Sequence, residues 1–266
     1  MNNKKSFFCI SYYEGDLEWI NTLCDDNYII YNKSGKEIYG FKNVVNIPNV
    51  GYNIASYLFF ILNNYHELPE TIIFCKNNVF PRHVNRQYFE SVINKSIFTP
   101  IENICNKNLN FPASFLLNDN GFVEINNSWY INKHPKKYFI DYNDFFKYVF
   151  QTKFSPLFLR FSPGANYIVP KNNILIRSKS FYYNLLQFVS HSQFSCESHF
   201  VERSLYTIWN SSINENINMK KKLSKNDLNH LVNNVSKYKN KYFNKFNRYL
   251  YVFLVSKITY LLFRNE

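Results

Sequence analysis

Cysteine motifs are missing from this sequence of 266 residues. The five cysteines are an odd number and widely scattered, no two of them form a CxxC pair, and no histidine lies at zinc-finger spacing. This pattern argues against a disulfide framework or a structural zinc site. It is typical of reduced thiols, so we expect a cytoplasmic protein.

Long apolar runs are missing as well. The first run, residues 7–13, follows two lysines but is closed by Glu14 and Asp16, and no small-residue cleavage site comes after it. It therefore predicts a buried first strand and not a signal peptide. The apolar stretch 249–263 spans about 15 residues and includes Lys257. It is short of the ~20 residues that crossing a bilayer requires.

Charged residues are somewhat sparse at 19%, whereas hydrophobic residues make up 46% and aromatic residues 20%. A chain of this composition is far too apolar to remain disordered. Its length suits one large domain, or one domain with a helical appendage.

The net charge of +12 is concentrated near the C-terminus. Residues 219–266 contain eleven Lys or Arg against two acids, so they carry +9 and the preceding 218 residues only +3. Tyr and Phe residues of this tail fall at helix-packing spacing and not on an exposed stacking platform. We therefore expect residues 213–266 to form a basic amphipathic helical tail on an anionic membrane surface, with no nucleic-acid partner. The alternative is a helix that closes the protein's own core or a dimer interface.

The first 80 residues predict a parallel α/β sheet. Apolar runs at 7–13, 28–31, 43–47 and 71–75 predict strands, and a helix is predicted from about residue 53. The apolar positions of this helix follow the i, i+3, i+4, i+7 rule, so one stripe should pack on the sheet: Ile54, Tyr57, Leu58, Ile61, Leu62 and Tyr65. Strand, loop, helix and strand in this order form the unit of a parallel sheet with crossover helices.

The second half of the chain predicts more helices. Residues 144–150, 180–189 and 198–210 indicate helices, and residues 157–161 and 166–169 indicate strands around a Ser-Pro-Gly-Ala loop. The helix 198–210 has a buried side of Val201, Leu205 and Ile208. Its other side is a polar stripe that we expect to line a cleft: His199, Glu202, Arg203 and Tyr206.

Several short segments in one order along residues 7–210 resemble a known family. They are residues 11–19, 30–33, 47–51, 57–58 and 64–65, Phe74 with His83, residues 162–165, and residues 201–203 with Trp209. The ordered set resembles a family of bacterial and fungal proteins grouped as a domain of unknown function, itself similar to GT-A-type glycosyltransferases. The resemblance implies a GT-A-like, Rossmann-like domain over residues 1–212, with a mainly parallel sheet flanked by helices. One departure is that Tyr52 and Asn53 stand where the family usually has Arg and an acidic residue.

The resemblance implies transfer of a sugar from a nucleotide-sugar donor to a glycan or lipid-linked acceptor in cell-surface polysaccharide synthesis, at the cytoplasmic face of the membrane. A non-catalytic nucleotide or glycan binder on the same fold is the first alternative. A nucleic-acid-binding protein that uses the Lys-rich tail is the second.

Donor-binding candidates lie mostly in loops at the carboxyl ends of predicted parallel strands, where open α/β sheets bind ligands. Gly51 permits close approach of a phosphate, and the helix after it offers free N–H groups. The candidates are Tyr12, Glu14, Asp16, Asn32, Lys33, Asn49, Gly51, Asn53, Lys76, Asn77, Asn78 and His83. The alternatives are turn chemistry for the loops, a solvated acidic loop for Glu14 and Asp16, and a structural role for His83.

The sequence also has no Asp-x-Asp pair after a strand. Where the resemblance would place such a pair, after the strand 71–75, the chain has Lys76-Asn77-Asn78 and no carboxylate for a hard cation. We therefore expect a metal-independent site or one with unusual ligands, and we keep a divalent cation such as Mn or Mg as the alternative cofactor.

Candidate catalytic residues lie on the polar stripe: His199, Glu202 and Arg203. A carboxylate on a helix face beside a cation can act as general base or can anchor a hydroxyl, and a plain ion pair is the alternative. Acceptor-binding candidates lie in the tight turn, where small residues leave room for an acceptor: Ser162, Gly164 and Ala165. A turn without a ligand is the alternative there.

Overall fold

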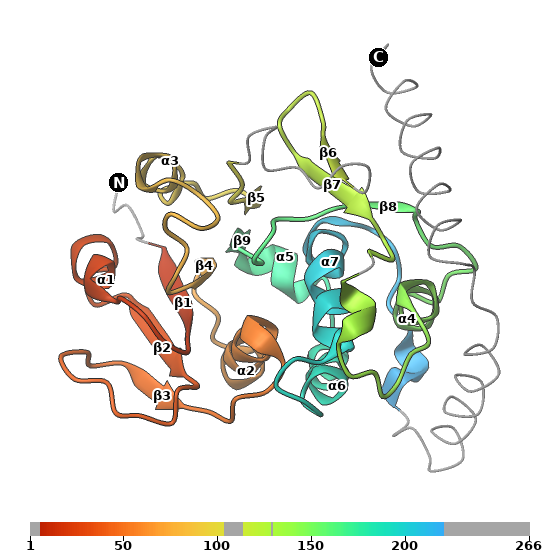
Figure 1. Cartoon of the computed structure of the whole chain (residues 1–266), viewed down its shortest axis with the longest axis horizontal. Coiled ribbons are helices and arrows are strands. Elements are labelled where there is room, and N and C mark those ends of the chain that lie inside the picture. The colour runs from red at the N-terminus through yellow and green to blue at the C-terminus, as the bar shows by residue number, and fades with distance from the viewer. Residues whose placement is uncertain (1–5, 104–113, 129, 221–266) are drawn as a thin grey trace.

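Two sheets organise the protein in the computed structural model, which describes residues 6–103, 114–128 and 130–220 (Figure 1). The larger sheet has the order β3-β2-β1-β4-β9-β5. Its strands are β3 (Val44–Asn46), β2 (Tyr28–Asn32), β1 (Phe7–Tyr12), β4 (Thr71–Lys76), β9 (Tyr167–Pro170) and β5 (Thr99–Pro100). The first four pair in parallel, whereas β9 is antiparallel to both β4 and β5. The expected mixed α/β fold with a mainly parallel sheet is confirmed.

The second sheet is a small antiparallel one. It consists of β6 (Ser114–Leu116), β7 (Phe122–Ile125) and β8 (Phe158–Arg160), in that order. The strand expected at 157–161 is therefore present, but it belongs to this second sheet. Strands β5, β6 and β7 were not predicted, because they have two to four residues each and show no clear periodicity.

Helices flank the larger sheet on both faces (Figure 1). Helices α1 (Glu18–Leu23) and α3 (Arg86–Val92) lie on one side. The other side has α2 (Tyr52–Asn64), α4 (Tyr142–Val149), α5 (Lys171–Leu175), α6 (Lys179–Val189) and α7 (Cys196–Asn210). Short 3-10 turns cover Ile131–Lys133 and Ile217–Lys220. The helices expected near 53–65, 144–150, 180–189 and 198–210 are confirmed, whereas α1, α3 and α5 are additional.

Alternating strand residues separate two hydrophobic cores. On β1 and β4, Cys9 and Phe74 contribute to the core beneath α2, α6 and α7, whereas Ile10 and Ile73 contribute to the core beneath α1 and α3. Successive side chains of a strand point to opposite faces, so strands buried on both faces appear as continuous apolar runs. This is why β1, β2 and β4 could be predicted from the sequence.

The start of the expected tail belongs to the folded domain. Asn216 donates from its backbone to Val149 and from its side chain to Tyr148, and Met219 is buried in the larger core. The remainder of the tail and Cys105 lie outside the described residues. The cysteines at positions 9, 24, 75 and 196 are buried free thiols. Among the described residues, every helix is too short or too polar to span a bilayer.

Candidate functional site

A cavity of about 230 Å³ lies between the start of α2, the end of β4 and the polar side of α7. Its lining comes from five separate parts of the chain, including the loop after β4 and the turn before β9. The lining residues are Tyr52, Asn53, Ile54, Lys76, Arg82, His83, Phe122, Tyr130, Phe161, Pro163, Gly164, Ser198, His199 and Glu202.

Sheet topology explains why the cavity lies there. The chain adds strands outward from β1 through β2 to β3 and then reverses to place β4 on the other side of β1. Open α/β sheets bind ligands beyond the carboxyl ends of their strands at such a reversal. Lys76 is the last residue of β4 and therefore enters the cavity at this edge.

The N-terminus of α2 opens onto the cavity. Gly51 and Tyr52 both have positive φ, +63° and +49°, and their N–H groups donate to the carbonyls of Ser192 and Gln193. Asn53 and Ile54, in the first helical turn, line the cavity. N–H groups of a first turn have no carbonyl partner within their own helix, so this end of α2 attracts anions.

Basic side chains contribute to the lining of the cavity. Lys76 and Arg82 both line it. Burial lowers the pKa of Lys76, the carboxylate of Glu202 opposes that shift, and the charge of Arg82 adds to it. Burial lowers the pKa of His83 to about 4, and the charges of Lys76 and Arg82 contribute. His83 is thus neutral near pH 7, and its buried Nε2 has no hydrogen-bond partner in the structure.

Glu202 supplies a negative charge to the same cavity. Its Oε1 accepts a 2.8 Å hydrogen bond from the N–H of Gly164, and its Oε2 lies 3.4 Å from Nδ1 of His199. Burial alone would raise the pKa of Glu202. The hydrogen bond from His199 and the positive charges of His199, Lys76 and Arg203 outweigh burial and lower that pKa to about 2. Glu202 is therefore a carboxylate at every physiological pH.

His199 is held between aromatic rings. Its ring centroid lies 4.8 Å from that of Tyr52 and 4.6 Å from that of His134. Because Nδ1 faces Glu202, the other nitrogen, Nε2, is the one left for a ligand. This Nε2 is buried and has no hydrogen-bond partner in the structure. A histidine oriented by a carboxylate through one nitrogen, with the other open, is the usual arrangement of an acid–base group.

The turn before β9 joins the two walls of the cavity. Asn53 donates to the carbonyl of Gly164, while the N–H of Gly164 donates to Glu202. Ser162 and Ala165 are fully buried and do not line the cavity. Ser162 donates its hydroxyl to the carbonyl of Ile101. Of the three acceptor candidates, Gly164 alone is therefore at the cavity.

Arg203 is not part of the cavity lining but lies behind it, against the rings of Tyr130 and Phe161. It is fully buried, forms an ion pair with Glu124 and donates to the hydroxyl of Tyr130. Tyr206 likewise packs against Phe98 and beneath Arg160. Of the four polar residues expected to line a cleft on α7, His199 and Glu202 therefore face the cavity, whereas Arg203 and Tyr206 do not.

Most of the donor candidates form turns outside the cavity lining. The side chain of Asn32 donates to Asn46 and accepts from the N–H of Ser34 in its own turn. Asn77 donates to the carbonyls of Glu14 and Asp16. Lys33 donates to the carbonyls of Val50 and Tyr52. Asn53, Lys76 and His83 line the cavity, whereas the other nine do not: Tyr12, Glu14, Asp16, Asn32, Lys33, Asn49, Gly51, Asn77 and Asn78.

The sequence did not single out several lining residues. Arg82 is one of them, although its position beside His83 was a usable signal. Phe122 and Tyr130 come from β7 and the segment after it, where no element was predicted, whereas Phe161 follows β8 at the end of the strand expected at 157–161. Within the described residues, no three His, Cys, Asp or Glu side chains are grouped so as to hold a metal ion.

The fold and the cavity define an α/β protein with a small cavity, lined by two basic side chains and one carboxylate, at the carboxyl edge of its sheet. Residues 9–225 match the model of the family described as "Protein of unknown function (DUF3431)". The match covers more than half of the chain, so the protein belongs to this family. No curated protein and no solved structure matches the chain.

Proposed function

We propose that this protein is a glycosyltransferase that moves a sugar from a nucleotide-sugar donor to a glycan or lipid-linked acceptor, with its catalytic centre in the cavity between α2 and α7. One observation carries the proposal. Two cations, Lys76 and Arg82, and the N-terminus of α2 share a cavity with an acid–base pair, His199 and Glu202. A reaction that expels a diphosphate and deprotonates a hydroxyl needs these two groups of side chains.

The donor's phosphates fit the basic side chains of the cavity. Lys76, Arg82 and the first-turn amides of α2 would hold the diphosphate by charge and hydrogen bonds. Pockets that enclose a complete drug-sized ligand measure roughly 300–1,000 Å³, and this cavity has about 230 Å³. We therefore assign the sugar and the adjacent phosphate to the cavity, with the nucleoside outside it, beyond the carboxyl end of β1. The parallel order β3-β2-β1-β4, the same as in Rossmann-type folds, supports a GT-A-like architecture.

His199 is better suited than Glu202 to act as the base. A carboxylate whose pKa is about 2 binds a proton weakly, and Oε1 of Glu202 already accepts from the N–H of Gly164, whereas Nε2 of His199 has no hydrogen-bond partner. In the proposed step, Nε2 of His199 takes the proton of the acceptor hydroxyl while the acceptor oxygen bonds to the anomeric carbon. The bond from that carbon to the diphosphate breaks, and its electron pair leaves with the diphosphate beside Lys76 and Arg82. Glu202 stabilises the imidazolium that forms.

The experiment is a binding and turnover screen on the full chain. Thermal unfolding is recorded with UDP-, GDP-, CMP- and dTDP-sugars, both with EDTA and with Mn²⁺, and release of the nucleotide is then measured. We expect at least one donor to raise the unfolding temperature, because a ligand of the folded state stabilises it. Arg82→Ala should weaken the binding of this donor. Arg86→Ala is a matched change in an exposed ion pair with Glu90 and should leave that binding unchanged.

Two outcomes oppose the proposal in different ways. Absence of any shift and of any nucleotide release across the panel would reject it. A shift that depends on Arg82 but is never followed by nucleotide release would instead favour the non-catalytic nucleotide binder on the same fold.

A further inference from the structure

Aromatic rings form a continuous series from the surface into the cavity. Phe194, in the loop between α6 and α7, is 44% exposed, and its ring centroid lies 4.8 Å from that of Tyr52. Tyr52 lines the cavity and contacts His199 at the same centroid distance. Phe194 therefore lies at the mouth of the cavity, one ring away from the proposed base.

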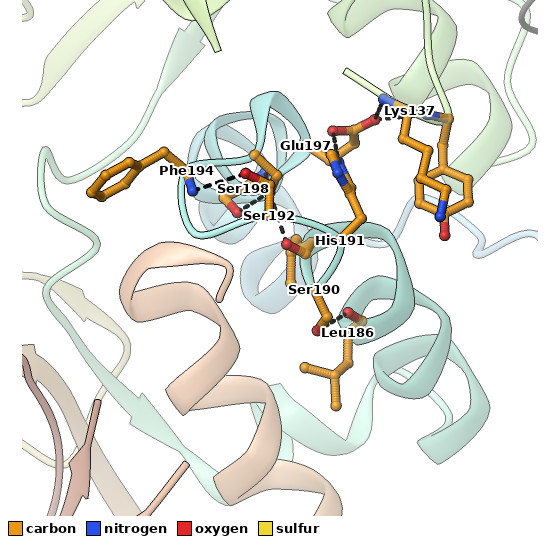
Figure 2. A network of polar contacts seen from close by, with 11 residues as sticks. Lys137, Leu186, Ser190, His191, Ser192, Phe194, Glu197 and Ser198 are labelled. Atoms are coloured by element: carbon orange, nitrogen blue, oxygen red, sulfur yellow. Dashed lines mark hydrogen bonds and ion pairs between the residues drawn. The ribbon is translucent and has the colours of Figure 1, made fainter. Parts of the chain in front are cut away.

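Backbone hydrogen bonds hold Phe194 in place. The loop accepts hydrogen bonds from the start of α2, at the carbonyls of Ser192 and Gln193, and the N–H of Phe194 donates to the hydroxyl of Ser192. Figure 2 shows the Phe194 side chain projecting away from this polar network. The ring is thus exposed on a fixed loop, so little conformational entropy would be lost when a ligand binds to it.

One buried carboxylate joins the two loops that carry the ends of this ring series. Glu197 forms a 2.7 Å hydrogen bond with Nε2 of His191 and accepts 2.8 Å hydrogen bonds from the N–H groups of Lys137 and Tyr138 (Figure 2). His191 precedes Phe194 in the loop between α6 and α7. Lys137 and Tyr138 follow His134, whose ring contacts His199. Glu197 therefore positions Phe194 and His134 relative to each other.

A sugar ring is the ligand whose chemistry fits this mouth. Its apolar C–H face can cover an exposed aromatic ring, and its hydroxyls can reach polar groups at the edge of that ring. The unpartnered Nε2 of His199 lies beyond Tyr52 in the same series of rings. We propose that Phe194 and Tyr52 form a stacking platform for the terminal sugar of a glycan acceptor, which presents its hydroxyl to His199. This inference rests on the transferase proposal, because it names that enzyme's second substrate.

The test uses saturation-transfer NMR on the full chain. The probes are methyl glycosides of glucose, galactose, mannose, N-acetylglucosamine and rhamnose. We expect at least one probe to receive saturation, and Phe194→Ala to weaken its binding roughly tenfold, as loss of a stacked ring does. Phe194→Trp should preserve binding. Phe154→Ala removes an exposed ring in a different loop, between α4 and β8, and should behave like the wild type.

These variants should stay folded because both phenylalanines are exposed, and thermal unfolding of each variant checks this. If no glycoside binds, or if Phe194→Ala and Phe154→Ala behave alike, the platform is rejected. The donor screen separates this failure from that of the proposed function. Donor turnover without any Phe194-dependent glycoside binding rejects the platform alone. Glycoside binding at Phe194 without any donor binding rejects the transferase and, with it, the acceptor role.

Discussion

The ring of His83 lies directly against Gly164. A Cβ atom added to Gly164 would lie 2.7 Å from both Cε1 and Nε2 of that ring. Gly164 also has a φ of +85°, and its N–H and carbonyl bond Glu202 and Asn53. A glycine at this position is what allows His83, Glu202 and Asn53 to converge on one cavity.

Replacing Gly164 with alanine should therefore disturb both stability and the site. Alanine at this φ is strained, which costs about 1 kcal/mol or more of unfolding free energy. Its Cβ would additionally displace His83. We expect Gly164→Ala to lose most of the thermal shift given by a nucleotide sugar.

Gly40→Ala is the matched control, because Gly40 has nearly the same φ, +84°, and no atom within 4 Å of an added Cβ. Denaturant titration should show the strain in both variants. Equal donor shifts in the two variants would contradict a role for the His83–Gly164 contact.

Glu202→Gln should change both turnover and the response to acid. The pKa of Glu202 is lowered from 4.5 to about 2 in the folded protein, so its carboxylate stabilises the fold fully above about pH 4.5. That stabilisation, about 3 kcal/mol by linkage, disappears as the pH falls towards 2. In Glu202→Gln this loss should be absent from the acid unfolding curve, and turnover should fall at neutral pH while the protein stays folded.

The surface change Glu90→Gln is the control, since Glu90 lies in an exposed ion pair. Undiminished turnover in folded Glu202→Gln would remove this carboxylate from the mechanism.

Lys33 should make the fold more stable as the solution becomes alkaline. It is buried, donates to the carbonyls of Val50 and Tyr52, and burial lowers its pKa from 10.5 to about 7. The unfolded chain therefore binds more protons at this residue between about pH 7 and 10.5, so folding becomes more favourable across that window. Relative to Lys33→Met, wild-type unfolding free energy should rise by up to about 1.4 kcal/mol per pH unit there.

Denaturant titrations at several pH values measure this difference. Lys36→Met, a change in an exposed lysine of the same turn, should leave the wild-type pH dependence intact. A parallel pH dependence in the wild type and Lys33→Met would show that Lys33 titrates normally.

Arg203 should matter for stability and not for chemistry. Arg203→Met leaves Glu124 as a buried charge without its partner, which costs about 3–5 kcal/mol. The double change Arg203→Met with Glu124→Met removes both charges and should regain much of that stability. We expect the double variant to bind the donor like the wild type in the thermal-shift screen. A folded double variant that binds no donor would show that Arg203 contributes to donor binding.

The parallel part of the fold follows from the amino-acid sequence alone. Strands β1, β2 and β4 are continuous apolar runs because both of their faces are buried, and the stripe of α2 follows from the helical period. The same local patterns placed His199 and Glu202 on one side of α7, and Lys76 at the end of β4. These patterns lie within single helices or strands, which is why the sequence alone was enough to predict them.

Which of the candidate residues meet depends on contacts between distant parts of the chain. Asn32, Lys33 and Asn77 had the expected position at the ends of strands, yet their side chains are used by neighbouring backbone groups. Arg203 is one residue from Glu202, but it points into the core because Glu124 of the second sheet lies there. Partners that are distant in sequence decide whether a polar side chain is free for a ligand, and the period of a helix or strand carries no information about them.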